Sequence, residues 1–384
     1  MRREIFEAEH DDLRTMARAF VQDHVEPRLP EWEAAGQVDR GLFAAAGELG
    51  LLGFDVDEKY GGGGVDDFRY NVVLNEELTR AGATSVVMNL CGFNDLIAPY
   101  LVQLCSDEQK RRWLPDLCAG RSVAAVAMTE PGAGSDLKAI TTTATLDGDD
   151  YVLNGAKTFI TNGVLADLVV VAAKTDPSAG SRGISLLVVE RGMTGFERGR
   201  RLHKIGLAAQ DTAELFFDGV RVPRANLLGE VGAGFGYLMR NLVQERLSVS
   251  VTAVASMHRA LDEALAYTKE RRAFGQRIAD FQTTKFTLAE LATQVEVAQV
   301  FLDRCIAGHV RHDLTEVEAA MCKWWVTELQ QQVVTRALQL HGGYGFMREY
   351  GIAREFMDAR ASTLYAGTTE IMKEIIGRSL VREH

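Results

Sequence analysis

The chain has 384 residues, of which 47% are hydrophobic and 25% are charged, a composition typical of a globular protein with a large core. Its formal net charge of −11 disfavours nucleic acid or an anionic membrane as a partner. Because no uninterrupted apolar stretch matches a bilayer, no signal peptide is evident, and the five cysteines and eight histidines show no zinc-binding spacing, we expect a cytoplasmic protein with free thiols and no metal.

Residues 1–121 are expected to form an N-terminal helical domain. Apolar residues recur at helical spacing from Leu13 to Val21 and again from Leu42 to Leu52. The run Ser106-Asp-Glu-Gln109 is a capping box, a pattern in which the first and fourth side chains bind backbone N–H groups at a helix start. It predicts a short helix that continues through Trp113.

Residues 122–230 are expected to form a middle β domain. Three dipeptides typical of hairpin turns occur here, Asp147-Gly148, Asn154-Gly155 and Asp218-Gly219. Short β-branched runs alternate with these and other turns: Thr141–Leu146, Tyr151–Leu153, Leu168–Ala172, Ile184–Val189 and Leu215–Phe217. The spacing predicts a compact antiparallel sheet or barrel. Strands and helices do not alternate in this region, which excludes a Rossmann domain.

Residues 231–384 are expected to form a C-terminal bundle of four helices joined by short connections. A second capping box, Thr315-x-x-Glu318, marks the start of one of them. The periodic segments are Tyr237–Lys269, Phe281–His309, Thr315–Leu340 and Thr369–Val381. The whole chain is therefore predicted to have an α+β fold with helical, β and helical domains in that order.

The run Ala127–Asp136 places two glycines, a proline and two hydroxyls between strand-like and loop-like sequence. Glycine permits close backbone approach, so this is either a ligand loop or an ordinary turn. Its sequence resembles the signature motif of the acyl-CoA dehydrogenase family, in which this loop holds the isoalloxazine ring of FAD and the substrate thioester. The resemblance extends from about Ala8 to the C-terminus. It implies FAD contacts at Met128, Thr129, Gly134 and Ser135, and a substrate contact at Ser135.

A second motif, Lys157-Thr-Phe-Ile-Thr-Asn-Gly163, follows a predicted strand. Taken alone, it is a strand end with an Asn-Gly turn. In the family the equivalent aromatic residue packs on the flavin and the threonine hydroxyl reaches flavin N5. The resemblance therefore implies cofactor contacts at Phe159, Ile160 and Thr161, where an aromatic face and a donor near N5 suit a flavin.

Two further stretches, Arg271–Gln282 and Gln339–Gly343, lie in the helical bundle. In the family they contact the FAD of a neighbouring subunit, which implies a homotetramer built from dimers. An Arg fork also suits a pyrophosphate group. Without the family, a basic helix end and a Gly-rich helix stop explain both stretches. The implied cofactor residues are Arg271, Phe274, Gln282, Gln339, Leu340, His341, Gly342 and Gly343.

The catalytic base departs from the commonest family pattern. Many members carry a glutamate just before the Gly-Thr of the last helix, but this chain has Ala366 there, and alanine cannot accept a proton. The branch that includes the long-chain and isovaleryl enzymes instead carries the base in a Glu-Arg pair on the first long bundle helix. The resemblance thus makes Glu245 the base. The alternative is a solvent-facing glutamate.

The same resemblance implies contacts beside the base and at the start of the last helix. Val243, Arg246, Ala366 and Gly367 are expected to contact the substrate. Thr368 and Glu370 are expected to contact FAD.

The resemblance implies an FAD-dependent oxidoreductase of fatty acid β-oxidation. It converts a saturated acyl-CoA to a trans-2-enoyl-CoA and passes electrons to an electron-transfer flavoprotein. A flavoenzyme that uses oxygen or a carrier-protein-bound acyl group, and a non-catalytic scaffold protein, remain alternatives. The densest basic patch is either a CoA contact or a solvated turn: Arg198, Arg200, Arg201 and Lys204. The acyl chain length is not fixed by the sequence.

Overall fold

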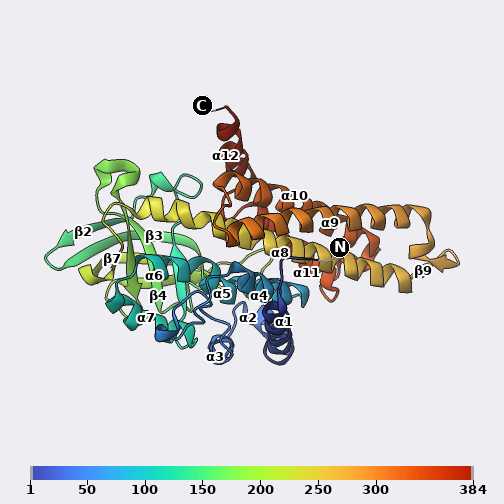
Figure 1. Cartoon of the computed structure of the whole chain (residues 1–384), viewed down its shortest axis with the longest axis horizontal. Helices are drawn as coiled ribbons and strands as arrows, with labels where there is room; N and C mark the ends of the chain where they lie inside the picture. Colours follow the sequence, from blue (N-terminus) through green and yellow to red (C-terminus); the bar gives the residue numbers. More distant parts are fainter. Residues whose placement is uncertain (1–2, 382–384) are drawn as a thin grey trace.

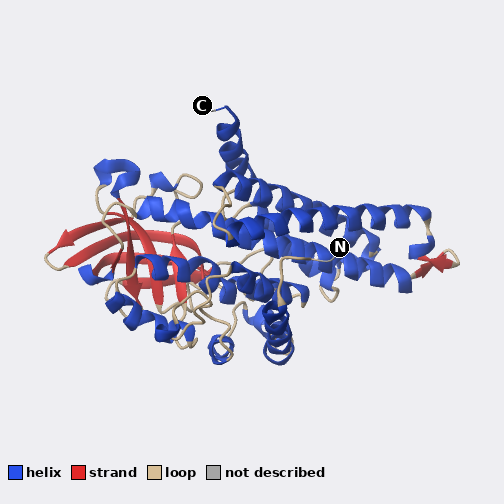
Figure 2. Ribbon diagram, viewed as in Figure 1, coloured by secondary structure: helices blue, strands red, loops and turns tan. Residues whose placement is uncertain are grey.

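The computed structural model describes residues 3–381, and in it a sheet lies at one end of a long stack of helices (Figures 1 and 2). The N-terminal helices lie below the long C-terminal helices in the view of Figure 1. They are α1 (Ala8–Phe20), α2 (Leu29–Ala35), α3 (Arg40–Glu48), α4 (Phe68–Arg80), α5 (Thr84–Gly92), α6 (Ala98–Leu104) and α7 (Asp107–Cys118).

The predicted start of α7 is confirmed. Ser106 Oγ accepts from Gln109 N at 3.2 Å, and Gln109 Oε1 accepts from Ser106 N at 2.8 Å. The helix continues beyond Trp113 to Cys118, with Pro115 inside it. A capping box fixes a start through local hydrogen bonds but carries no information about the end, so only the start was predictable.

The continuous helical stretch Thr84–Leu104 is long and apolar enough to cross a membrane by length and composition alone, with a mean hydropathy of 1.3. It consists of α5, the π-helical turn η3 (Phe93–Ile97) and α6. In the fold, 83% of its most apolar window is buried, against α4, α8 and the sheet. Its apolar character therefore builds the core.

The eight-stranded sheet of the middle domain is mixed rather than purely antiparallel. Most neighbours are antiparallel, but β1 and β2 both pair parallel with β4. The main path runs β6-β7-β3-β2-β4-β5-β8, and β1 pairs with β4 off it. The strands are β1 (Ala124–Ala127), β2 (Thr143–Asp147), β3 (Asp150–Thr161), β4 (Leu168–Lys174), β5 (Ile184–Glu190), β6 (Phe196–Arg201), β7 (Thr212–Pro223) and β8 (Leu227–Leu228).

Two of the three predicted hairpin turns are wrong. Asp147 and Asp150 do pair across a turn between β2 and β3. Asn154-Gly155 and Asp218-Gly219, however, lie inside the long strands β3 and β7, at a shift in their register. There the Asn154 side chain accepts from Gly219 N at 2.8 Å. The two dipeptides lie opposite each other at this register shift, and the hydrogen bond joins them. The turn-forming sequence therefore forms a bulge between the paired strands β3 and β7 rather than a hairpin turn.

The C-terminal domain is dominated by three long helices, and the fourth predicted helix is shorter. Of these, α8 is the longest; at 37 residues it is about 55 Å long. The helices are α8 (Gly234–Glu270), α9 (Gln282–Val310), α10 (Glu316–Leu340), α11 (Gly351–Ala359) and α12 (Thr369–Val381), with a small hairpin of β9 (Arg272–Ala273) and β10 (Gln276–Arg277) after α8. Figure 1 shows α8, α9 and α10 running side by side and α12 projecting from α10, so the predicted C-terminal helical domain is confirmed.

The position of α8 organises the candidate site. Its first turn begins at Gly234, where a Cβ would lie 2.9 Å from the Ile184 carbonyl oxygen of β5, so the helix starts tightly against the sheet. Its other end reaches β9 at the opposite end of the molecule (Figure 1). The helix α8 therefore contains the predicted base near the sheet, and its other end leads to the residues predicted to contact the FAD of a neighbouring subunit.

Candidate functional site

The loop after β1 is held by a buried ion pair. Lys157 Nζ on β3 lies 2.9 Å from Glu130 Oε1 and donates to the Met128 carbonyl at 2.9 Å. Glu130 also accepts from the backbone N–H groups of Thr141 and Thr142 at 2.6 and 2.9 Å. Burial alone would raise the pKa of Glu130, but these hydrogen bonds and the charge of Lys157 bring it to about 2. The ion pair therefore fixes the shape of the predicted flavin loop.

The two predicted flavin motifs are brought together. Thr158 N donates to the Thr129 carbonyl at 2.9 Å, which joins the loop to the end of β3. The next residue, Phe159, has a φ of 60° and leaves 68% of its surface exposed. A left-handed backbone is uncommon for an aromatic residue and is typical of functional sites. Here it exposes a large apolar face next to the point where β3 meets Thr129.

Thr161 is bound by a residue that the sequence did not reveal. Gln210, in the loop between β6 and β7, donates its side-chain amide to Thr161 Oγ1 at 2.7 Å. The other amide atom of this buried side chain, Oε1, has no hydrogen-bond partner in the part of the chain that the structure describes. The loop is fastened on both sides, because Lys204 Nζ donates to the Gln210 carbonyl and Leu207 N donates to Asp358 of α11.

The predicted base, Glu245, is buried on α8 with only 4% of its surface exposed. Its Oε1 accepts a hydrogen bond from the Tyr100 hydroxyl of α6 at 3.2 Å. Burial raises the pKa of Glu245 to about 7, since the Tyr100 hydrogen bond and the charge of Arg246 offset only part of the desolvation. A carboxylate with a pKa near neutrality is suited to general base catalysis.

Arg246 follows Glu245 on α8 and forms an ion pair with α10. Its guanidinium is buried and lies 3.2 Å from Glu316 Oε1, while its Nε has no hydrogen-bond partner among residues 3–381. Val243 is half-buried one turn earlier. The structure thus places Arg246 between α8 and α10.

The turn before α12 contains Ala366, with a φ of 53°, and Gly367, with a φ of 95°. Lys323 of α10 is buried and donates to the Gly367 carbonyl at 2.6 Å. Burial, and then the nearby charge of Arg246, lowers the pKa of Lys323 to about 8. Lys323 therefore joins the Ala366–Gly367 turn to α10, which packs along α8.

The two remaining residues at the start of α12 differ in exposure. Thr368 Oγ1 accepts from Ile371 N at 3.4 Å and so caps the helix. Glu370 is on the exposed side of the first turn. Neither is buried with Glu245.

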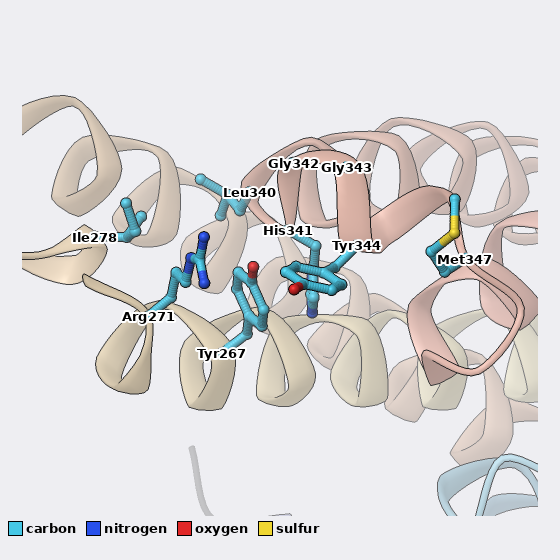
Figure 3. Close-up of a pocket in the computed structure, with 9 residues that line it drawn as sticks. All are labelled: Tyr267, Arg271, Ile278, Leu340, His341, Gly342, Gly343, Tyr344 and Met347. Atoms are coloured by element: carbon cyan, nitrogen blue, oxygen red, sulfur yellow. The ribbon is translucent and has the colours of Figure 1, made fainter. Parts of the chain in front are cut away.

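At the opposite end of α8, a cavity of about 500 Å³ lies between α8 and the turn after α10. Figure 3 shows the rings of Tyr267, His341 and Tyr344 side by side, with Arg271 near the first of them. The Tyr267 and His341 rings stack at 4.5 Å, and the Arg271 guanidinium lies 5.6 Å from the centre of the Tyr344 ring. Leu340, Gly342 and Gly343 complete this cavity, whereas Gln339 does not line it.

The remaining predicted residues of this end are exposed. Phe274 has a φ of 51° and is 95% exposed at the hairpin after α8, and Gln282 begins α9 nearby. The stretch of α8 from Glu245 to Arg271 is about 39 Å long, which separates this group from the flavin motifs of the same chain. The structure therefore gathers the predicted site residues into two separate groups.

Three of the four cations of the basic patch bind backbone carbonyls. Arg198 donates to the Ala166 and Gly163 carbonyls at 2.6 and 3.2 Å. Arg201 donates to the Ala35 carbonyl and Lys204 to the Gln210 carbonyl. Arg200 and Lys204 are exposed, so a contact with CoA stays a prediction.

Five buried residues of the site were not among the predicted ones: Tyr100, Glu130, Lys157, Gln210 and Lys323. Glu130 and Lys157 lie inside the two quoted motifs, so their opposite charges were a signal that could have been used. Nothing in the sequence near Tyr100, Gln210 or Lys323 indicates their partners, which are distant in the chain.

Comparisons with known proteins cover the whole length of the chain. Residues 7–121, 125–220 and 232–381 match the N-terminal, middle and C-terminal domain models of acyl-CoA dehydrogenase. The mitochondrial long-chain specific acyl-CoA dehydrogenase of Sus scrofa is 47% identical over 99% of this chain and 88% of its own length.

Solved structures agree. The acyl-CoA dehydrogenase of Geobacillus kaustophilus is 49% identical with a TM-score of 0.97, over 99% of this chain and all of that one. A chain in a structure of the electron transferring flavoprotein of Acidaminococcus fermentans is 35% identical with a TM-score of 0.92, over 98% of this chain and 99% of that one.

Proposed function

Because this chain belongs to the acyl-CoA dehydrogenase family, we propose that Glu245 is the base that removes the α-proton from a long-chain acyl-CoA. The class of reaction follows from the family. The protein is an FAD-dependent oxidoreductase that dehydrogenates acyl-CoA thioesters and passes electrons to an electron-transfer flavoprotein. The observation that supports Glu245 is its burial beside Tyr100, where its pKa is about 7.

At the end of α8 that lies near the sheet, which we call the sheet end, the residues can accommodate a flavin. Phe159 presents an exposed aromatic face, and Thr161 Oγ1 lies beside a buried Gln210 oxygen that lacks a partner within the described residues. Gly132 has open space where a Cβ would lie, so a planar ring can approach the backbone there. We assign the flavin contacts to the loop Met128–Ser135 and to the stretch Phe159–Thr161.

The chemistry divides between the cofactor and Glu245. When bound, FAD supplies the acceptor for the hydrogen that leaves C3 with its electron pair. Glu245 accepts the C2 proton as the C2–C3 double bond forms, so its carboxylate must be ionised beforehand. The rate of flavin reduction is therefore expected to rise as the pH increases through about 7.

The thioester must be polarised for this proton to leave. In our proposal the carbonyl lies near the Ala366–Gly367 turn, where α12 begins and its first N–H groups have no helical partners. Donors aimed at the developing negative charge lower the barrier. Lys323 holds the turn through the Gly367 carbonyl and so fixes where these donors point.

The long-chain preference is supported by the 47% identity to an enzyme named for it. We expect kcat/KM for straight-chain acyl-CoAs to increase from butanoyl to hexadecanoyl, measured with an electron-transfer flavoprotein as acceptor. A maximum at butanoyl-CoA would contradict this preference and leave the assignment of the base intact.

We propose that the protein is a homotetramer built from dimers, in which the far end of α8 binds the FAD of a neighbour. The cavity at Arg271 is open, and Glu245 of the same chain is about 39 Å away along α8. Large apolar side chains are exposed around it, namely Phe274, Phe286, Phe346 and Met347. Exposed apolar groups of this size mark association surfaces. Sedimentation of an active, FAD-loaded monomer would contradict this proposal.

The cytoplasmic location of the protein stays a prediction.

The direct test of the base is Glu245→Gln, which keeps the shape and removes the acceptor. We expect substrate-dependent bleaching of the flavin to slow by about 10²–10⁴-fold while FAD content stays normal. The control is Glu374→Gln, which changes an exposed glutamate of α12 and should leave the rate unchanged. Near-normal bleaching in Glu245→Gln would show that another group is the base.

A further inference from the structure

A buried tyrosine connects α6 to the predicted base on α8. Tyr100 is fully buried, and its hydroxyl donates to Glu245 Oε1 at 3.2 Å. Asn241, which is buried one helical turn before Glu245, lies near the same hydroxyl and lowers the pKa of the phenol. The Tyr100 hydroxyl is therefore the donor that the structure places on Glu245.

We propose that Tyr100 is a positioning residue that distinguishes the two oxygens of Glu245, holding Oε1 and leaving Oε2 free to accept the substrate proton. The inference rests on the proposed role of Glu245 as the base. It adds a residue that lies in another domain and 145 positions earlier in the chain.

The direction of the hydrogen bond is fixed by its surroundings. Burial and the charge of Glu245 raise the pKa of Tyr100 well above its usual value, so the phenol keeps its proton and stays a donor.

This arrangement suits both states of the base. Before the reaction, the phenol stabilises the ionised carboxylate. After the reaction, Oε2 carries the proton and Oε1 is a carbonyl oxygen, which still accepts from Tyr100. Proton transfer therefore requires no rotation of the carboxyl group, and a base that is already oriented avoids a reorganisation cost.

The neighbouring charged groups are occupied elsewhere. On α8, Arg246 is paired with Glu316, and on α10, Lys323 donates to the Gly367 carbonyl. On η3, Asp95 accepts from Ser248 and from Asn71. Among the described residues, Tyr100 is therefore the group that hydrogen-bonds the carboxylate of Glu245 directly, and its removal has a specific consequence.

The test is Tyr100→Phe, which keeps the ring in the core and removes the donor. Losing a hydrogen bond to a carboxylate raises the pKa of that carboxyl group. The pH at which flavin reduction reaches half its maximal rate should move up by about one unit, and the rate below pH 7 should fall about tenfold. The measurement is anaerobic stopped-flow reduction at saturating acyl-CoA across pH. KM should change little, because the phenol does not contact the substrate.

A second readout does not depend on turnover. The infrared band of the protonated Glu245 carboxyl group, assigned by its loss in Glu245→Gln, should persist to a higher pH in Tyr100→Phe. The matched control is Tyr60→Phe, which removes a buried tyrosine hydroxyl that donates to Asp107 at 3.0 Å, far from the base. That variant should leave both the pH profile and the infrared band unchanged.

The outcomes separate the two proposals. An unchanged pH profile and infrared band in FAD-loaded Tyr100→Phe would overturn the role of Tyr100 while Glu245 remained the base. Normal reduction in Glu245→Gln would instead overturn the base itself. If Tyr100→Phe does not hold FAD, Asn241→Ala answers the question, because it removes the buried amide next to the phenol, loosens the position of the hydroxyl and should produce a smaller shift in the same direction. No shift in that variant would contradict the proposal.

Discussion

The two ends of α8 carry site residues that are completed in different ways. At the sheet end, each motif meets a partner within the chain: Lys157 binds Glu130, and Tyr100 binds Glu245. At the other end, Arg271 borders an open cavity and Phe274 is almost fully exposed. Folding of one chain therefore brings the predicted base and the flavin loops together with their partners, whereas in our proposal the second group of cofactor residues is completed by another chain.

The prediction with the largest effect mixes two inactive chains. Glu245→Gln damages only the sheet end, and Arg271→Glu places a negative charge where the neighbour's pyrophosphate is expected. Each variant alone should be nearly inactive. In a hybrid dimer one site combines two intact ends, so random co-assembly should restore about a quarter of the wild-type sites. The measurement is activity per chain after co-expression, with hybrid formation verified by differently tagged chains.

In the matched control, both chains carry the same substitution at the sheet end. Co-expressing Glu245→Gln chains that carry the two different tags should restore nothing. If verified hybrids of Glu245→Gln and Arg271→Glu also stay inactive, the two ends do not share a cofactor across chains.

The second prediction moves the carboxylate within the sheet end. Lys323 of α10 binds the Gly367 carbonyl, and α10 packs along α8, so we expect positions 245 and 366 to flank the same substrate carbon. Glu245→Ala with Ala366→Glu should regain part of the activity that Glu245→Ala loses. Recovery should be incomplete, because a misplacement of about 1 Å costs about 10²-fold. A larger side chain at 366 should also narrow the acyl cavity, so bulky substrates should be disfavoured.

This exchange is measured by the rate of flavin reduction with straight and branched acyl-CoAs. If Ala366→Glu restores nothing while FAD and thioester binding are normal, the two positions do not share a substrate carbon.

The third and smallest effect concerns stability. Lys157→Met leaves the buried Glu130 without its cation, which should lower the free energy of unfolding by about 3 kcal/mol. Because this pair lies within one chain, the loss measured by urea denaturation should not depend on protein concentration. Lys59→Met, which removes an exposed ion pair with Asp57, should leave stability nearly unchanged. A concentration-dependent loss in Lys157→Met would contradict the view that this end is complete within a chain.

Local sequence signals predicted the elements that local hydrogen bonds build. The two capping boxes mark the starts of α7 and α10, and α12 has the bounds that its periodicity indicated. The parallel pairing of β1 with β4 was not predictable, because no turn links these strands and their register depends on contacts across the sheet. For the same reason, the sequence predicted a turn at Asn154-Gly155, whereas the structure places this dipeptide in a bulge opposite Gly219.

The sequence by itself determined the family, the order of the domains and the candidate base, because motifs such as Ala127–Asp136 and the Glu245–Arg246 pair are contiguous. Only the tertiary structure decided how that base is set up. The burial that brings the pKa of Glu245 to about 7 comes from packing α8 against other helices, and its donor, Tyr100, is 145 residues away. Desolvation and hydrogen bonding depend on distances in space, and no local pattern in the chain records which distant residue will supply them.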